Sequence, residues 1–314
     1  MSDQEYASDL GGFVLARSDL DRASGRRGNE EWVGAAWSDP RTRVLVLSGG
    51  KTLMRFTGNS AELVLVPAFE APEGLRFLLG VDSSRVAYFG VSAQSLSISP
   101  DAATGQAQGE IRPAGLRDAA ALLSDRDAGL FTHAVALANW HDTHTHCPRC
   151  GALTTPRAAG HARVCPVDGS EHFPRIDPAV IMLVTDAEDR ALLARNRQWP
   201  ERRVSILAGF VEAGESAEQA VTREVGEETG IKVSRIRYLG SQPWPMPQSL
   251  MLGFRALADG DLSVRVDQEE IAEARWYTRD GLRVALAAGE VVLPPPVSIA
   301  HRIIESWYGE KLPA

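Results

Sequence analysis

Three acidic side chains, Glu224, Glu227 and Glu228, occupy positions i, i+3 and i+4 of one segment. At helical periodicity this spacing brings their carboxylates to one side of a helix. Like charges so placed oppose helix formation by roughly 0.2–0.5 kcal/mol per pair, and Arg223 can offset part of this through Glu227. Clustered carboxylate oxygens are the ligands that Mg²⁺ or Mn²⁺ requires, although a solvated acidic face is the commoner meaning of such a run alone.

The surrounding residues predict where this helix begins and ends. Ser216 can act as the N-cap, with Gln219 as its capping-box partner, and Gly230 suits the left-handed position after the last turn. Apolar residues recur at helical spacing and should face the core. These are Ala217, Ala220, Val221 and Val225.

Composition favours a globular enzyme over a nucleic-acid-coating protein. The chain has 314 residues and a net charge of −8, with 44% hydrophobic and 24% charged residues. About 150 residues per domain gives roughly two domains. An acidic chain that binds an anionic substrate needs local positive charge, which metal cations supply. No stretch approaches the roughly 18 apolar residues of a membrane span, and the first residues resemble no signal peptide. We therefore expect a cytoplasmic protein.

The chain divides into three sections. Residues 1–140 predict a β-rich N-terminal domain with a meandering sheet and trailing helices, and carry no recognisable catalytic signature. Residues 141–173 hold every cysteine, and residues 174–314 predict a mixed α/β (α+β) domain. The expected strands are Val44–Leu47, Leu63–Val66, Leu75–Leu79, Val86–Phe89, Ala179–Val184, Ala191–Ala194, Val204–Leu207, Ile236–Leu239 and Leu250–Ala258. The other expected helices are Leu116–Leu123, Ala128–Trp140 and Ser298–Tyr308.

The segment from Gly209 to Ile231, GFVEAGESAEQAVTREVGEETGI, resembles the signature box of the Nudix hydrolases at every fixed position. The resemblance implies the Nudix fold, a mixed sheet between helices, with the box forming loop, helix and loop. It implies that Glu224 and Glu228 are the principal metal ligands and that Glu227 supports them. It further implies that Arg223 orients these carboxylates, that Gly209 leaves room for metal or substrate, and that the Ala208 carbonyl is a backbone metal ligand.

The next segment, Ser241–Ser249, reads SQPWPMPQS. Its prolines stiffen the loop, Trp244 offers a flat apolar face, and Gln242, Gln248 and Ser249 offer hydrogen-bonding groups. That combination suits a nucleotide pocket. The segment is similar to the array that marks the NAD(H) pyrophosphatase branch of the Nudix family, which implies that these four residues bind substrate.

Further positions match the same branch. Glu270, within EEIAEARWY, matches a further acidic metal ligand or base, with Glu269 and Glu273 as rivals. Ala300, within LPPPVSIAH, matches a residue lying against the substrate. Phe210 matches an aromatic that stacks on a ring of the dinucleotide. Phe173 matches an aromatic supplied across a dimer interface, which implies a homodimer.

The implied activity is metal-dependent hydrolysis of the pyrophosphate bond of NAD(H) to AMP and nicotinamide mononucleotide. The metals would sit on Glu224, Glu228 and Glu270 and lower the pKa of a bound water, and Glu228 or Glu270 would accept its proton. NAD joined to the 5′ end of RNA contains the same scissile bond. The alternatives are hydrolysis of another nucleoside diphosphate derivative, such as ADP-ribose or coenzyme A, and a non-catalytic Nudix binding protein.

The cysteines predict a structural zinc site. Cys147-Pro-Arg-Cys150-Gly is a zinc-knuckle-like turn, and Cys165-Pro-Val-Asp168-Gly repeats it with aspartate at the last ligand position. Relatives in the resembling branch carry such a ribbon between two domains. We expect Zn²⁺ on Cys147, Cys150, Cys165 and Asp168, with His172 as the alternative fourth ligand.

Overall fold

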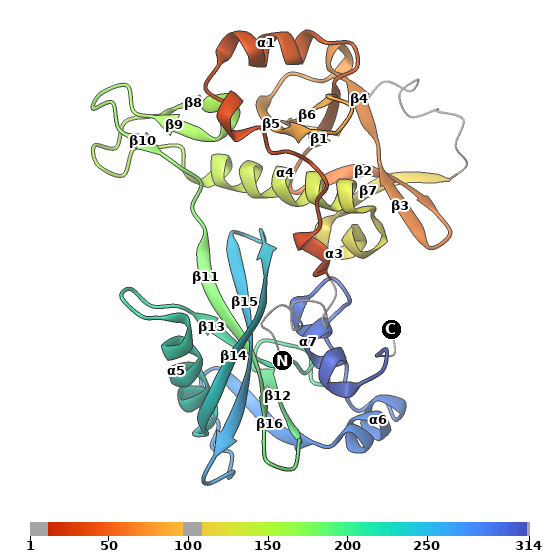
Figure 1. The fold of residues 1–314 in the computed structure, drawn as a ribbon, viewed down its shortest axis with the longest axis vertical. Coiled ribbons are helices and arrows are strands. Elements are labelled where there is room, and N and C mark those ends of the chain that lie inside the picture. The colour runs from red at the N-terminus through yellow and green to blue at the C-terminus, as the bar shows by residue number, and fades with distance from the viewer. Residues whose placement is uncertain (1–11, 97–108, 313–314) are drawn as a thin grey trace. The chain divides into compact units, whose positions relative to one another are not determined.

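The structure is a computed structural model that describes residues 12–96 and 109–312. Its backbone contacts divide the chain into two compact units (Figure 1). Unit 1 contains Met1–Ala16, Asp177–Pro243 and Ser249–Ala314, and unit 2 contains Arg17–Ile176 and Trp244–Gln248. The first eleven residues, where we expected no signal peptide, lie outside the described ranges.

Unit 1 is built on a six-stranded mixed sheet. Strand β11 is parallel to β15 and antiparallel to β12 and β13, and β12 is antiparallel to β16. The sheet order is β14 (Lys232–Trp244), β15 (Ser249–Asp259), β11 (Asp177–Thr185), β12 (Ala191–Asn196) and β16 (Ile271–Tyr277), with β13 (Leu207–Phe210) added beside β11.

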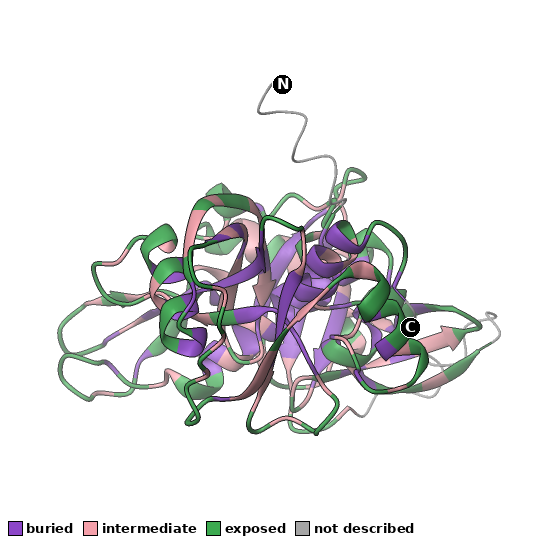
Figure 2. Cartoon of the chain, turned by 90° about the horizontal axis from the view of Figure 1, so that it is seen from below, coloured by how far each residue is buried: buried purple, intermediate pink, exposed green. Residues whose placement is uncertain are grey.

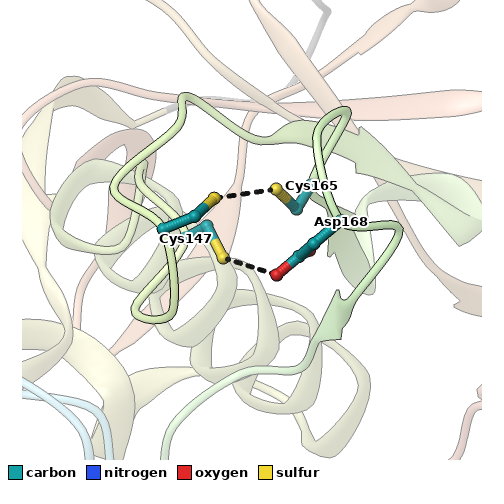
Figure 3. A group of neighbouring side chains, drawn as sticks. Cys147, Cys165 and Asp168 are labelled. Carbon is teal, nitrogen blue, oxygen red and sulfur yellow. Dashed lines mark hydrogen bonds between the residues drawn. The ribbon is translucent and has the colours of Figure 1, made fainter.

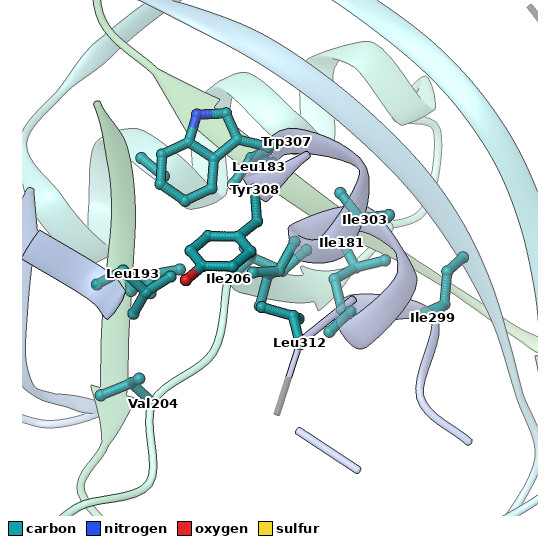
Figure 4. Packing of buried hydrophobic residues seen from close by; sticks show 14 of the residues in the cluster. Ile181, Leu183, Leu193, Val204, Ile206, Ile299, Ile303, Trp307, Tyr308 and Leu312 are labelled. Atoms are coloured by element: carbon teal, nitrogen blue, oxygen red, sulfur yellow. The ribbon is translucent and has the colours of Figure 1, made fainter. Parts of the chain in front are cut away.

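Alternation along β11 divides the core of unit 1 between two faces, because successive strand residues point to opposite sides. Val180 and Met182 pack with residues of α5 (Ala217–Thr229) on one face. Ile181 and Leu183 pack on the other face with α6 (Arg279–Ala287) and α7 (Ile299–Tyr308), as Figure 4 shows for α7. A mixed sheet between helices is the arrangement expected from the resemblance, and that prediction is confirmed.

The glutamate-bearing helix α5 has the predicted ends. The Ser216 hydroxyl accepts a hydrogen bond from the Gln219 backbone N–H at 3.2 Å, and the Gln219 side chain accepts one from the Ser216 N–H at 2.9 Å. Gly230 ends the helix at φ +71°, a conformation that glycine adopts without steric cost. Capping therefore fixes the register of the helix and the direction in which its glutamates point.

Besides a cysteine-bearing ribbon, unit 2 contains two small sheets. In the first, of order β4-β1-β6-β5, β1 runs parallel to β6, whereas the second has order β3-β2-β7. The strands are β1 (Arg43–Leu47), β2 (Lys51–Thr57), β3 (Ser60–Leu63), β4 (Leu65–Pro67), β5 (Leu75–Val81), β6 (Ala87–Ser92) and β7 (Glu110–Gly115), and the helices are α1 (Glu30–Ser38), α3 (Leu116–Ala119) and α4 (Asp125–Thr143). Apolar side chains of α1 pack on the first sheet.

The cysteine-bearing part of unit 2 is a short three-stranded ribbon. It contains β8 (Thr155–Arg157), β9 (Ala162–Val164) and β10 (Glu171–His172), in the order β10-β9-β8. Single turns of 3₁₀ helix occur in both units, at η1 (Val14–Ala16), η2 (Ser24–Arg26), η3 (Ala68–Glu70), η4 (Ala120–Leu122) and η5 (Ala158–Gly160). Figure 2 shows buried residues concentrated on strands and inner helix faces.

Most of the predicted elements are present, with several differences. The expected strand Val204–Leu207 is wrong, because β13 begins at Leu207 and Ser205 makes only an isolated bridge to Ala194. The run Leu63–Val66 is divided between β3 and β4. The N-terminal sheet is not a meander, since β1 pairs in parallel with β6. Helices α1 and α6 were not predicted.

Among residues 12–96 and 109–312, the structure contains no helix that is long and apolar enough to cross a membrane.

Replacing the helix cap tests the local account of α5. Ser216→Ala should lower the free energy of unfolding by about 1 kcal/mol and speed hydrogen exchange at the Gln219 amide, which loses its acceptor. Thr222→Ala on the same helix is the control, because the Thr222 hydroxyl binds only the Glu218 carbonyl within the helix. Equal exchange rates at Gln219 in both variants would contradict the capping role.

Candidate active site and zinc ribbon

Gly209 on β13 lies against the carboxylate of Glu224 on α5. A Cβ atom added at Gly209 would overlap the Glu224 carboxyl carbon and both of its oxygens. Glycine is therefore required here because the Glu224 carboxylate approaches so closely. The backbone at Gly209 is extended, so glycine is not needed for its conformation. The contact brings the strand backbone and the first metal-ligand candidate to the same point.

Arg223 connects the glutamates of the box. Its Nε and Nη2 donate to the two oxygens of Glu215, each at 2.8 Å, and its Nη1 donates to Glu224 at 2.8 Å and to Glu227 at 3.1 Å. Its Nη2 also donates to the Phe210 carbonyl at 2.9 Å. The hydrogen bonds from Arg223 lower the pKa of Glu215 to about 2. One guanidinium thus orients three carboxylates and the end of β13.

Glu228 is the most buried of these carboxylates. Its side chain has an oxygen, Oε2, with no hydrogen-bond partner. Burial first, and then repulsion from Glu224, Glu270, Glu227 and Asp267, raises the pKa of Glu228 to about 8. Burial also raises the pKa of Glu224, although Arg223 opposes that shift. A bound cation would stabilise the ionised form of a carboxylate that is buried among like charges.

The carboxylates line a cavity of about 820 Å³ within unit 1. Of the predicted site residues, the cavity wall contains Ala208, Phe210, Arg223, Glu224, Glu227, Glu228, Ser249 and Glu270. Phe210 is 59% exposed, so its ring is available to a ligand. The structure therefore brings together the box residues and two residues, Ser249 and Glu270, that are distant in sequence.

Two further acids on the wall of this cavity, Glu212 and Asp267, were not predicted. Asp267 lines the wall and donates its backbone N–H to the Glu228 carbonyl at 3.2 Å. The signal that could have found it is its position three residues before Glu270 in an acidic run. Of the two rivals to Glu270, Glu273 pairs with Arg275 at 3.1 Å, and neither Glu269 nor Glu273 is part of the cavity wall.

Two of the residues expected to bind substrate, Gln242 and Ala300, lie in the interior of unit 1 rather than on the cavity wall. Gln242 is fully buried: its Oε1 accepts from the Leu15 N–H at 3.3 Å and its Nε2 donates to the Val297 carbonyl at 3.1 Å, so its amide is used within the protein. Ala300 lies on α7 within the hydrophobic core rather than on the cavity wall. Trp244, Gln248 and Phe173 belong to unit 2.

The donor set fits a hard divalent cation. Glu224, Glu227, Glu228, Asp267 and Glu270 surround one cavity, and one Glu228 oxygen has no partner. Carboxylate and carbonyl oxygens are the ligands preferred by Mg²⁺ and Mn²⁺. Ala208 also lies on the cavity wall, so its carbonyl stays a predicted backbone ligand of the metal.

The four predicted zinc ligands converge. One ligand atom from each of Cys147, Cys150, Cys165 and Asp168 lies within 4.8 Å of the others, and none of the cysteines forms a disulfide. The Cys150 and Cys165 sulfurs are 3.4 Å apart, and Cys147 Sγ lies 3.8 Å from Asp168 Oδ2. Figure 3 shows the side chains of Cys147, Cys165 and Asp168 pointing into a common space. Three thiols and one carboxylate fit a closed tetrahedral zinc site.

Local hydrogen bonds orient Asp168 as a ligand. Its Oδ1 accepts from the Ser170 N–H at 2.9 Å and from the Ser170 hydroxyl at 2.6 Å, which leaves Oδ2 facing the sulfurs. The two turns match, because Gly151 and Gly169 adopt φ +75° and +71° and donate to the Cys147 and Cys165 carbonyls. His172 instead lies 3.0 Å from the Ser170 hydroxyl and is not part of the cluster.

Burial of Glu228 predicts a pH-dependent stability in the metal-free protein. Between pH 4.5, the ordinary pKa, and about 8, the folded state holds a proton that the unfolded state releases. The free energy of unfolding should therefore fall as pH rises through this window, and Glu228→Gln should flatten that fall. Thermal unfolding in buffer without Mg²⁺ or Mn²⁺ measures this, with Glu218→Gln as the control, because Glu218 is exposed on the same helix and does not line the cavity. A pH dependence unchanged by Glu228→Gln would contradict the assignment.

Zinc retention tests the fourth ligand. Asp168→Ala should lose most of the bound zinc, because three thiolates leave one position open, whereas Asp168→Cys and His172→Ala should retain it. Elemental analysis after dialysis against a weak chelator provides the measurement. Retention in Asp168→Ala combined with loss in His172→Ala would assign the ligand to the histidine.

Comparisons with known proteins identify the family of each part of the chain. Three family models match the chain: a NUDIX domain at residues 175–294, an NADH pyrophosphatase zinc ribbon domain at 142–173, and an NADH pyrophosphatase-like rudimentary NUDIX domain at 41–140. Together they span both units.

Two curated relatives are similar over most of the chain. A Mycobacterium bovis protein named NAD-capped RNA hydrolase NudC is 44% identical over 309 residues, which are 94% of each chain. A human protein named NAD-capped RNA hydrolase NUDT12 is 33% identical over 331 residues, covering 92% of this chain and 71% of that protein. The crystal structure of a NUDIX hydrolase from Nitrosomonas europaea covers 53% of this chain and 94% of its own, with 22% identity and a TM-score of 0.41. On the family models and the sequence relatives, the chain belongs to the NADH pyrophosphatase branch of the Nudix hydrolases.

Proposed function

We propose that this enzyme hydrolyses the pyrophosphate bond of NAD(H), giving AMP and nicotinamide mononucleotide, and that it also removes NAD caps from RNA 5′ ends. The observation that carries the proposal is the cavity of unit 1, in which the carboxylates of the Nudix box meet Glu270. The names of the relatives supply the substrate class, since both are NAD-capped RNA hydrolases.

Glu224, Glu228 and Glu270 are the proposed ligands of catalytic Mg²⁺ or Mn²⁺, with Asp267 beside them. When bound, such cations neutralise the pyrophosphate and make water a better nucleophile. Glu228 or Glu270 accepts the proton of the attacking water, because both carboxylates line the cavity in which the scissile bond would lie. Arg223 holds Glu224 and Glu227 in place through its hydrogen bonds and is a positioning residue.

Phe210 and Ser249 are the proposed substrate contacts on the wall of this cavity. Phe210 is exposed enough to stack on a base or nicotinamide ring, and Ser249 offers a hydroxyl. Gln242 instead connects the backbones of Leu15 and Val297, and we assign it the role of fixing the strand that leads to the Trp244 loop. The intact carboxylate set argues against a non-catalytic binding protein, which has no need of clustered acids.

The ribbon is proposed to hold one structural zinc, since all four ligand positions are filled by the protein. Free thiols in such a site are typical of a reducing compartment, which supports a cytoplasmic location. We also keep the three-part division proposed from sequence, at residues 1–140, 141–173 and 174–314.

We also propose that the protein forms a homodimer. Phe173 and Ile176, at the end of the ribbon, are 64% and 61% exposed. Large apolar side chains exposed together are typical of surfaces that another chain covers. In the resembling branch the residue at the Phe173 position contributes to the pocket of the partner, so we propose the same role for Phe173.

The products identify the bond that is cut. Purified protein with Mn²⁺ or Mg²⁺ should convert NADH to AMP and reduced nicotinamide mononucleotide, and Glu228→Gln should lower kcat by about a hundredfold or more, because it removes a ligand charge. Chromatography of the products decides this. Primary release of free nicotinamide and ADP-ribose would contradict the proposal, as would faster turnover of ADP-ribose or coenzyme A than of NADH.

Light scattering tests the dimer. We expect twice the 34.0 kDa chain mass. Phe173→Ala should raise KM for NADH, and the exposed ribbon residue Val167 provides the matched control Val167→Ala. A fully active species at the monomer mass would refute this part of the proposal.

A further inference from the structure

Unit 2 contains a second cavity, of about 360 Å³, whose residues take no part in the proposed hydrolysis. It lies where helix α1 and strand β5 meet the 3₁₀ turn η5 of the ribbon. Trp37, Phe77 and Phe89 supply an apolar wall, and Arg27, Arg76 and Arg157 supply three guanidinium groups. A cavity of this size matches a mononucleotide rather than a longer ligand.

The charges of the cavity wall favour an anionic ligand. The acid lining the wall is Glu30, which lies 3.5 Å from Arg157, with both side chains largely exposed. Arg27 is half-buried and donates to the Arg22 carbonyl at 2.9 and 3.2 Å. Burial and the neighbouring charge of Arg22 lower the pKa of Arg27, and Asp21 offsets only part of this. Positive charge is thus concentrated at the cavity and incompletely compensated.

The aromatic wall favours a planar ligand. The guanidinium of Arg76 stacks over the Trp37 ring with its carbon 4.2 Å from the ring centroid. Phe89 contacts the same ring edge-on, with centroids 5.2 Å apart. A guanidinium lying over an indole places donors for a phosphate next to an aromatic wall against which a base can lie.

The third wall is a backbone turn in a rarely adopted conformation. Ala158, Ala159 and Gly160 have φ values of +49°, +50° and +83°. A Cβ at Gly160 would overlap the Phe77 side chain, so the turn lies closely against β5. Two histidines hold it there. His141 Nε2 donates to the Gly160 carbonyl at 2.8 Å, and His161 Nε2 donates to the Leu78 carbonyl at 2.7 Å. Strained backbone fixed in this way is characteristic of preformed ligand sites.

We propose that this cavity binds a nucleoside phosphate, with the base against Trp37 and the phosphate among Arg27, Arg76 and Arg157. The ligand is a second nucleotide, distinct from the one that is hydrolysed, and it is either free or part of an RNA strand. The site would give the N-terminal part of the chain, for which the sequence predicts no chemistry, a role in recognition. It goes beyond the proposed hydrolysis and does not depend on it.

Photolabelling of the zinc-loaded protein in buffer without Mg²⁺ or Mn²⁺ separates this site from the cavity of unit 1. With 8-azido-AMP as the probe, peptides from α1 or residues 156–160 should be labelled, and AMP should compete. The double variant Arg27→Gln/Arg76→Gln should weaken this labelling about tenfold or more. Arg112→Gln is the matched control, because Arg112 stacks over Phe56 at 3.8 Å in the same unit but outside the cavity.

Competition identifies the ligand class. A 5′-phosphorylated ten-nucleotide RNA that competes better than AMP would assign the site to a strand, and the reverse would assign it to a free nucleotide. Competition by inorganic phosphate as strong as that by AMP would overturn the nucleotide assignment. Labelling confined to unit 1, or unchanged in a double variant that keeps its zinc and circular dichroism, would overturn the site itself. NADH hydrolysis is measured separately, so either proposal can fail alone.

Discussion

Repulsion among carboxylates in one partly dehydrated cavity is the constraint around which unit 1 is arranged. Glu224, Glu227 and Glu228 approach each other on one helix, and Glu270 approaches from the loop before β16. Arg223 neutralises part of this charge and fixes the side chains, but it does not reach the buried oxygen of Glu228. The site therefore keeps an excess of negative charge, which a bound divalent cation would neutralise.

The rest of unit 1 supports this arrangement by packing. Alternate residues of β11 contact α5 on one face and α7 on the other, so the central strand fixes the helix against a rigid sheet. Strand β13 adds to β11 and carries Gly209 against Glu224. The capping box at Ser216 then sets the rotation of α5. Small shifts in any of these contacts would move the carboxylates, and metal sites tolerate little displacement.

Features that depend on local sequence were predictable, whereas those that depend on distant partners were not. The ends of α5, the glutamate cluster and the paired cysteine turns follow from residue types at short spacing. The role of Gln242 depends on the Leu15 backbone, 227 residues away, so its amide was assigned to substrate instead. The parallel pairing of β1 with β6 likewise forms only in the folded chain. Ala300 matched a motif, but its helix turns it into the core.

Manganese binding to Gly209→Ala tests the central claim most directly, because the added methyl group would occupy the position of the Glu224 carboxylate. The matched control is Gly226→Ala on α5, where an added Cβ meets nothing within 4 Å. Electron paramagnetic resonance titration of zinc-loaded protein should show Mn²⁺ affinity reduced by about tenfold or more in Gly209→Ala and unchanged in Gly226→Ala. Wild-type affinity in Gly209→Ala would contradict the claim that close approach of β13 and Glu224 builds the metal site.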